Sequence, residues 1–289
     1  MSSLLVERTT RGLGDAVMLS STVSSLRNTL GAEDVRVSVS EGLQPVFHHN
    51  PDVDVLTTPA LADREVDVVA DCSTACAVYE TDNQPLIDKN RPQVWCEAAG
   101  QVWDRSPPRL YLSAHEEAEA ERFAHPLPRP IIGVGYASVD EWRNYPYMRI
   151  LIAKIGAKLG GTTVLFHDKH PKLWGKKTDV RLCVAEPLRS YFTKAAACDL
   201  MVSPDTGHIH VAAALGVPVY IIDGPTDGAL RMEGYEVDFE RPPRYEHCGR
   251  QPSWYQHCDP CWCLHSLRPE VIIHGVERLW RRTRYGLGT

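Results

Sequence analysis

The stretch DLMVSPDTGHIHVAAALGVPVYIIDGPTD, residues 199–227, decides the fold. An apolar segment leads into Asp205, Thr206 and Gly207; a run of small apolar residues typical of a helix follows, and then the buried strand pattern VPVYIIDG. A strand, a helix and a second strand in this order predict a parallel sheet with right-handed crossovers. The helix therefore begins at the carboxyl edge of a sheet, where ligands of such proteins bind.

The same alternation of strands and helices runs through the whole chain of 289 residues and is interrupted once, by the prolines of HPLPRP at 126, 128 and 130. Three prolines this close make a stiff segment that suits a domain linker. We therefore expect two doubly wound, Rossmann-like α/β domains, residues 1–126 and 127–289, which face a ligand-binding cleft.

Composition and net charge favour a soluble globular protein over a nucleic-acid-binding or membrane-spanning one. Apolar residues make up 43% of the chain and charged residues 24%, which is typical of a soluble globular protein. The net charge of −6 argues against nucleic acid as the main partner. No apolar run approaches the roughly 20 residues that span a bilayer, and the first residues do not resemble a signal peptide. We expect a cytoplasmic protein without stable membrane insertion.

The mouth of the helix after Pro204 suits an anion. A helix N-terminus carries unsatisfied N–H groups and about half a positive charge, which favours phosphate. Gly207 permits close approach of a ligand, and Thr206 adds a hydroxyl. The carboxylate of Asp205 would repel phosphate, so we expect it to bind backbone N–H groups or sugar hydroxyls. An ordinary capped helix remains an alternative, because Asp and Thr are common caps.

A second loop of this form, TTRGLGDAVML, occupies residues 9–19. Gly12 and Gly14 provide the tight turn, and Asp15 opens the next helix. The loop lacks the third glycine of the dinucleotide-binding fingerprint. Two interpretations of Asp15 stay open on the residues alone: it caps the helix, or it faces the cleft as a general base.

Three segments, in order and spacing, resemble the heptosyltransferase-like glycosyltransferases of glycosyltransferase family nine. They are RGLGDAVMLSSTVSSLR (11–27), EWRNYPYMRILIAKIG (141–156) and SPDTGHIHVAAALGVPVYIIDGPTD (203–227). The resemblance implies a GT-B fold and the inverting transfer of a sugar from a nucleotide-diphosphate donor to an acceptor hydroxyl. It also implies that the donor binds mainly to the C-terminal domain and the acceptor mainly to the N-terminal one.

The resemblance assigns roles to individual residues. Asp15 matches the catalytic base, and Gly12 and Gly14 belong to the acceptor-side loop. The positions that match donor binding are Arg143, Asp205, Thr206, Gly207 and His208. Arg143 stands where the family usually has Lys, and His208 where it usually has Pro. A guanidinium and a helix N-terminus can stabilise a leaving nucleoside diphosphate without a metal, so we expect no catalytic metal.

A cysteine-rich insertion, residues 247–265, precedes the C-terminal helix. Its thiols are Cys248, Cys258, Cys261 and Cys263. In a cytosolic protein, four thiols this close suggest a structural zinc or iron ion. A patch of reduced thiols or a disulfide is the alternative.

Two other functions fit the same pattern: a nucleotide-sugar epimerase of the 2-epimerase type, and a non-catalytic module that binds a nucleotide sugar. The residues leave open which sugar and nucleotide form the donor. They also leave open whether the acceptor is a saccharide, a protein, a metabolite or a nucleobase, and whether the protein is an oligomer.

Overall fold

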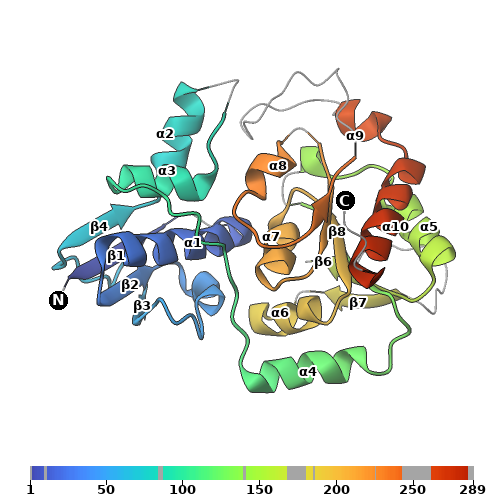
Figure 1. The fold of residues 1–289 in the computed structure, drawn as a ribbon, viewed down its shortest axis with the longest axis horizontal. Helices are drawn as coiled ribbons and strands as arrows, with labels where there is room; N and C mark the ends of the chain where they lie inside the picture. Colours follow the sequence, from blue (N-terminus) through green and yellow to red (C-terminus); the bar gives the residue numbers. More distant parts are fainter. Residues whose placement is uncertain are drawn as a thin grey trace. The chain divides into compact units, whose positions relative to one another are not determined.

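The structure is a computed structural model. It describes residues 2–9, 12–83, 87–138, 141–167, 180–184, 186–224, 226–242 and 262–285. The chain divides into two compact units (Figure 1). Unit 1 comprises Met1–Ser113 and Ala229–Tyr235, and unit 2 comprises Ala114–Gly228 and Glu236–Thr289.

The division after Ser113 differs from the expected boundary at residue 126. The helix α4, Ala114–Ala124, packs against α6, Leu188–Ala196, and Glu116 forms a salt bridge with Arg189. These contacts assign α4 to unit 2, although the proline-rich stretch lies after it. Residues 229–235 belong to unit 1 although the segments before and after them belong to unit 2, and no feature of the local sequence predicts this.

Unit 1 contains a four-stranded parallel sheet in the order β3-β2-β1-β4. The central strand β1 has Leu4, Leu5 and Val6 fully buried, as expected of an apolar run with neighbours on both sides. The strands are β1 Ser3–Glu7, β2 Asp34–Ser38, β3 Val55–Thr57 and β4 Val68–Asp71.

The helices of unit 1 place charged residues near the carboxyl ends of these strands. The elements are α1 Leu13–Leu30, η1 Glu41–Val46, α2 Ala75–Asp82 and α3 Arg91–Ala98. Helix α1 ends at Gly31, whose φ of 62° is the left-handed conformation that glycine favours. Helix α3 begins at Asn90, whose side chain accepts a hydrogen bond from the Gln93 N–H. This cap places Arg91 in the first turn.

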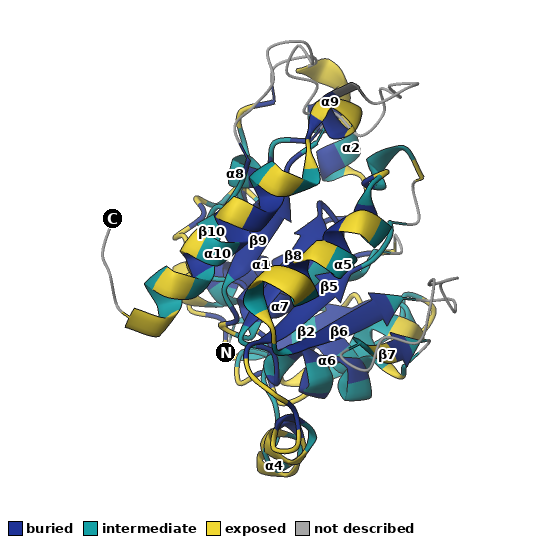
Figure 2. Ribbon diagram, turned by 90° about the vertical axis from the view of Figure 1, so that its right-hand side faces the viewer, coloured by how far each residue is buried: buried dark blue, intermediate teal, exposed yellow. Residues whose placement is uncertain are grey.

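Unit 2 contains a six-stranded parallel sheet in the order β10-β9-β8-β5-β6-β7. All residues of β8 are buried, and Figure 2 shows the central strands β5, β8 and β9 in the buried colour. The strands are β5 Ile131–Gly135, β6 Thr162–His167, β7 Val180–Val184, β8 Leu200–Pro204, β9 Val219–Ile222 and β10 Phe239–Glu240.

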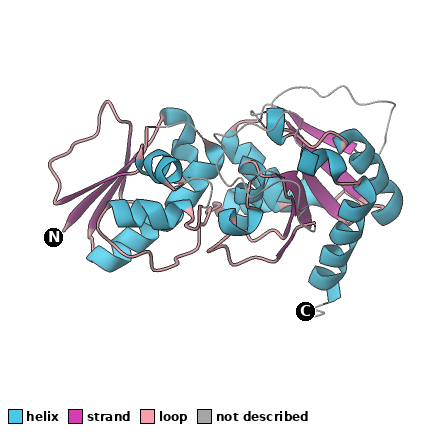
Figure 3. Cartoon of the chain, turned by 90° about the horizontal axis from the view of Figure 1, so that it is seen from above, coloured by secondary structure: helices cyan, strands magenta, loops and turns pink. Residues whose placement is uncertain are grey.

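Helices flank the strands of unit 2 (Figure 3). Helices α5, α9 and α10 contribute to one apolar core with β5, β8 and β9. Gly275 of α10 lies against the Tyr220 ring, where a side chain would collide. The remaining elements are η2 Glu141–Arg143, α5 Met148–Leu159, α7 Gly207–Ala214, α8 Gly228–Arg231, α9 Trp262–Ser266 and α10 Pro269–Tyr285. The prediction of two parallel α/β sheets is confirmed.

Two expectations depend on which residues the structure describes. Of the cysteine-rich insertion, residues 247–261 lie outside the described ranges. Within those ranges, none of the helices is both long and apolar enough to span a membrane.

Candidate functional site

Asp15 lies in the first turn of α1 and binds two guanidinium groups. Its Oδ2 accepts a hydrogen bond from Arg8 Nη2 at 2.7 Å, and its Oδ1 accepts one from Arg91 Nη1. The N-cap position of α1 is occupied by Gly12, without a side-chain cap. A Cβ at residue 12 would lie 2.9 Å from Asp15 Oδ2. The absence of a side chain at Gly12 therefore makes room for the carboxylate.

The arginines control the ionisation of Asp15. Burial by itself would raise the pKa of Asp15, but the charges of Arg91 and Arg8 and the hydrogen bond from Arg91 lower it from 3.8 to about 2. Asp15 is therefore ionised near neutral pH and is a weak base. A carboxylate offers about four lone-pair positions, and the two arginine contacts leave others for a substrate hydroxyl.

The Asp15 site extends into a buried charge cluster that consists of Arg8, Asp15, Glu80, Arg91 and Arg231. Arg91 Nε lies 3.3 Å from Glu80 Oε1, and Arg231 Nη2 lies 3.2 Å from the same oxygen. The exposed fraction is 3% for the Glu80 side chain and 6% for that of Arg231. Unit 1 thus brings three positive and two negative groups together, of which Asp15 and Arg91 are partly exposed.

Arg8 has two further contacts that fix its position. Its Nη1 donates to the Cys72 carbonyl oxygen at 2.9 Å, and its guanidinium lies 4.8 Å from the centroid of the Trp95 ring. The sequence patterns gave no role to Arg8, Glu80, Arg91 or Arg231. Only Arg8 had a local signal, because it lies seven residues before Asp15 and flanks the same glycine turn.

Thr206 is the N-cap of α7. Its hydroxyl accepts a hydrogen bond from the His208 N–H at 3.2 Å and shares one with the Ser203 hydroxyl at 2.9 Å. The residue is 7% exposed. The capping interpretation is therefore what the structure shows for the Thr206 side chain, while the contact of Thr206 and Gly207 with a diphosphate stays a prediction.

Asp205 and Arg143 meet in unit 2, although 62 positions separate them. Arg143 Nη1 donates to the Asp205 carbonyl oxygen at 3.2 Å and lies 3.7 Å from Asp205 Oδ2. His210 Nε2 lies 3.8 Å from Asp205 Oδ1. Two of the predicted donor-binding residues are thus neighbours at the mouth of α7. No pattern in the sequence indicated a role for His210.

His208 packs among aromatic side chains. Its Nδ1 lies 2.8 Å from the Tyr191 hydroxyl, and its ring centroid lies 6.3 Å from that of Phe166. Burial raises the pKa of Tyr191 well above its ordinary value, so this hydroxyl keeps its proton. A Cβ on Gly135 would lie 2.8 Å from the His208 Cβ. Donor binding by His208 stays a prediction, and the contact with Tyr191 explains its orientation.

The proposed metal ligands fall mostly outside the described residues. Cys248, Cys258 and Cys261 lie there, whereas Cys263 is a buried residue of α9. Among the described residues, no group of three or more His, Cys, Asp or Glu side chains could hold a metal ion. The cysteine site therefore stays a prediction.

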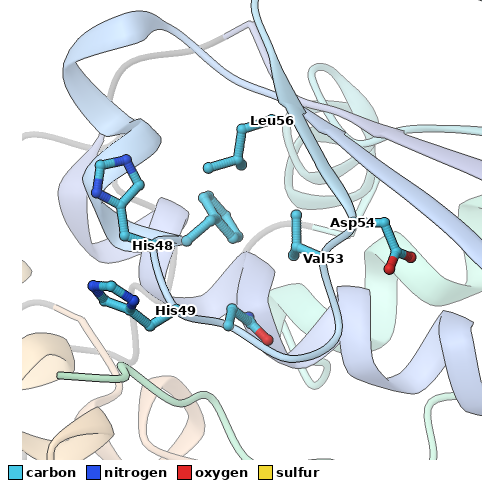
Figure 4. Close-up of a pocket in the computed structure, with 7 residues that line it drawn as sticks. His48, His49, Val53, Asp54 and Leu56 are labelled. Carbon is cyan, nitrogen blue, oxygen red and sulfur yellow. The ribbon is translucent and has the colours of Figure 1, made fainter. Parts of the chain in front are cut away.

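A cavity of about 370 Å³ lies in unit 1 (Figure 4). His48 and His49 lie on one side of it, Asp54 lies on the opposite side, and Val53 and Leu56 lie between them. Its lining includes none of the residues that the sequence analysis selected.

Comparison with known proteins relates one segment of the chain to a family. Residues 165–235 match the model of glycosyltransferase family 9 (heptosyltransferase). This segment includes Asp205, Thr206 and His208 but neither Asp15 nor Arg143. No curated protein matches the chain.

Several solved structures are similar over nearly the whole chain. A family 9 glycosyltransferase from Veillonella parvula is 17% identical with a TM-score of 0.75, covering 97% of this chain and 98% of that one. The E. coli ADP-heptose LPS heptosyltransferase II is 16% identical with a TM-score of 0.72, covering 98% of this chain and 100% of that one. The dodecameric, iron-containing glycosyltransferase TibC from enterotoxigenic E. coli is 14% identical with a TM-score of 0.71, covering 96% of this chain and 76% of that one.

These similarities show the fold of the chain, and the family match concerns one segment of it. The two parallel α/β units form the GT-B fold. The match over residues 165–235 agrees with the resemblance to the heptosyltransferase-like glycosyltransferases of family 9 in this part of the chain.

Proposed function

We propose that the protein transfers a sugar, with inversion, from a nucleotide-diphosphate donor to an acceptor hydroxyl. The observation that carries the proposal is the position of Arg143 beside Asp205 at the N-terminal mouth of α7. The guanidinium and the helix N-terminus are both positive groups. Together they suit the negative charge that develops on a departing diphosphate.

The proposed donor is an ADP-sugar, and ADP-heptose is the first candidate. Solved structures similar to this chain are described as an ADP-heptose heptosyltransferase and as complexes with ADP-D-beta-D-heptose and with ADP. In unit 2, backbone N–H groups near Gly207 would bind the diphosphate together with Arg143 and His208. The Thr206 hydroxyl already has two partners, so its contribution would be to hold the helix start.

Asp15 is the proposed general base. The acceptor oxygen forms a bond to the anomeric carbon while the bond from that carbon to the diphosphate oxygen breaks. The acceptor proton passes to Asp15, and the electron pair leaves with the nucleoside diphosphate. A carboxylate with a pKa of about 2 accepts this proton late, after bond formation has made the hydroxyl strongly acidic.

A binding and turnover experiment tests the proposal. The protein is titrated with ADP-heptose and with UDP-, GDP- and dTDP-sugars, and thermal stability and nucleotide release are both measured. Stabilisation by an ADP-sugar together with release of ADP supports the transferase. With saccharide, protein, metabolite and nucleobase acceptors present, stabilisation without release favours the non-catalytic binding module, and conversion of the sugar without release favours the epimerase. The absence of any stabilisation refutes the proposed donor class.

Two further proposals concern a structural metal ion and the oligomeric state. TibC is described as iron-containing and dodecameric. We propose that Cys248, Cys258, Cys261 and Cys263 hold one zinc or iron ion in a cytoplasmic protein. Metal analysis after purification without chelator tests this, and less than about half an equivalent of zinc plus iron counts against it. Light scattering tests for an oligomer.

A further inference from the structure

Glu80 has unused hydrogen-bonding capacity beside Arg91. Its Oε1 accepts a hydrogen bond from Arg91 Nε at 3.3 Å and two from Arg231, from Nη1 at 3.3 Å and from Nη2 at 3.2 Å. Its Oε2 is buried and has no hydrogen-bond partner among the described residues. The three contacts are long for charge-assisted hydrogen bonds. Glu80 therefore binds its arginines loosely, with one oxygen still to be satisfied.

Arg91 bridges the two carboxylates of the cluster. Its Nη1 donates to Asp15, and its Nε faces Glu80. A guanidinium has five N–H donors in a planar fork and can bind one carboxylate through two parallel hydrogen bonds. A small rotation of Arg91 toward Glu80 would satisfy Oε2, and the same rotation would loosen the contact of Arg91 with Asp15.

We propose that Glu80 and Arg231 are positioning residues for the transfer reaction: Glu80 competes with Asp15 for Arg91, and Arg231 holds Glu80 in place. This proposal rests on the proposed function, in which Asp15 accepts a proton. When Arg91 moves toward Glu80, Asp15 becomes more basic and presents a further lone pair to the acceptor hydroxyl. When Arg91 remains hydrogen-bonded to Asp15, the carboxylate stays weakly basic.

Arg231 is the last residue of the short helix α8, Gly228–Arg231. The N–H of Gly228, the first residue of α8, donates to Asp223 Oδ1 at 3.0 Å. Asp223 directly follows β9 of unit 2, whereas Arg231, at the end of the same short helix, belongs to unit 1.

A double-mutant cycle with Glu80→Gln and Arg91→Met tests the proposal. Release of ADP from ADP-heptose, in the presence of the acceptor that supports turnover of the wild type, gives kcat, and titration with ADP gives the Kd. We expect Glu80→Gln to lower kcat by about tenfold when Arg91 is present and by less than about twofold in the Arg91→Met background. The Kd for ADP stays within about twofold of wild type, because the change affects the base and not the donor.

Two results would overturn the role of Glu80. Equal losses of kcat in both backgrounds would mean that Glu80 acts independently of Arg91. An Arg91→Met variant that folds but has lost turnover would mean that Arg91 is required for the reaction instead of restraining Asp15. A wild-type protein that releases no ADP refutes the proposed function itself, and this proposal then falls with it.

Two further variants serve as controls in case Glu80→Gln fails to fold. Glu80→Gln leaves buried arginines less well paired, whereas Glu80→Gln combined with Arg231→Met removes one charge of each sign. We expect the double variant to fold and to show the same loss of kcat, and a wild-type kcat would contradict the proposal. Glu116→Gln is the matched control, because it removes the carboxylate partner of a comparably buried arginine in unit 2, and it should leave kcat unchanged.

Discussion

Replacement of Asp15 by Asn tests the charge cluster through stability and turnover together. The arginines lower the pKa of Asp15 from 3.8 to about 2, against the opposing effect of burial. At about 1.36 kcal/mol per pKa unit, this lowering contributes about 2 kcal/mol to the free energy of unfolding at pH 7. The side chain is 16% exposed, so solvent screening reduces this value only modestly.

The sign of the pH dependence follows from the direction of the shift. A carboxyl group whose pKa is lower in the folded state stabilises the fold above its unfolded pKa. This contribution is lost as the pH falls through the folded pKa. The stability difference between wild type and Asp15→Asn is therefore constant above about pH 5 and falls to roughly half by pH 3, between the two pKa values. If the substitution only disturbed packing, the variant would show the same loss of unfolding free energy at every pH.

Urea unfolding at pH 7, 5 and 3 measures this difference. Glu97→Gln, which removes a largely solvated partner of Lys89, serves as the control and should change stability by less than about 0.5 kcal/mol. In the same preparation, Asp15→Asn should keep nucleotide binding and lose about 10²- to 10⁴-fold in kcat. A pH-independent stability deficit would refute the electrostatic reasoning, and full turnover would refute Asp15 as the base.

Three further variants test the surroundings of the two sites. Gly12→Ala places a Cβ 2.9 Å from Asp15 Oδ2, so kcat should fall at least about tenfold while the ADP affinity measured by calorimetry is unchanged; a wild-type kcat would contradict this. Arg143→Met removes the guanidinium at the mouth of α7 and should weaken ADP binding by about ten- to a hundredfold; unchanged affinity would place the diphosphate elsewhere. Thr206→Val removes the cap of α7 and should lower the free energy of unfolding by about 1 kcal/mol, measured in urea, and an unaltered midpoint would argue against the cap.

Local patterns predicted much of the fold. The alternation of apolar strands with helices was sufficient for two parallel sheets, because strand and helix periodicities and helix caps depend on residues only a few positions apart. The same patterns selected Asp15 and the mouth of α7. They placed the domain boundary in the proline-rich stretch, however, because the contact of α4 with α6 has no local signal.

The chemical environment of these residues was decided by tertiary structure. Glu80 and Arg231 are 151 positions apart, and Arg91 and Asp15 are 76 apart, so no spacing rule links them. His208 has the sequence position of a ligand contact, but its orientation depends on Tyr191 and on the space beside Gly135. The sequence by itself determined which helices and strands form and which polar residues lie at the starts of the helices. Only the packed fold decided the charge, the partners and the basicity of those residues, because electrostatic energies depend on distance in space and on burial, and neither can be computed from order along the chain.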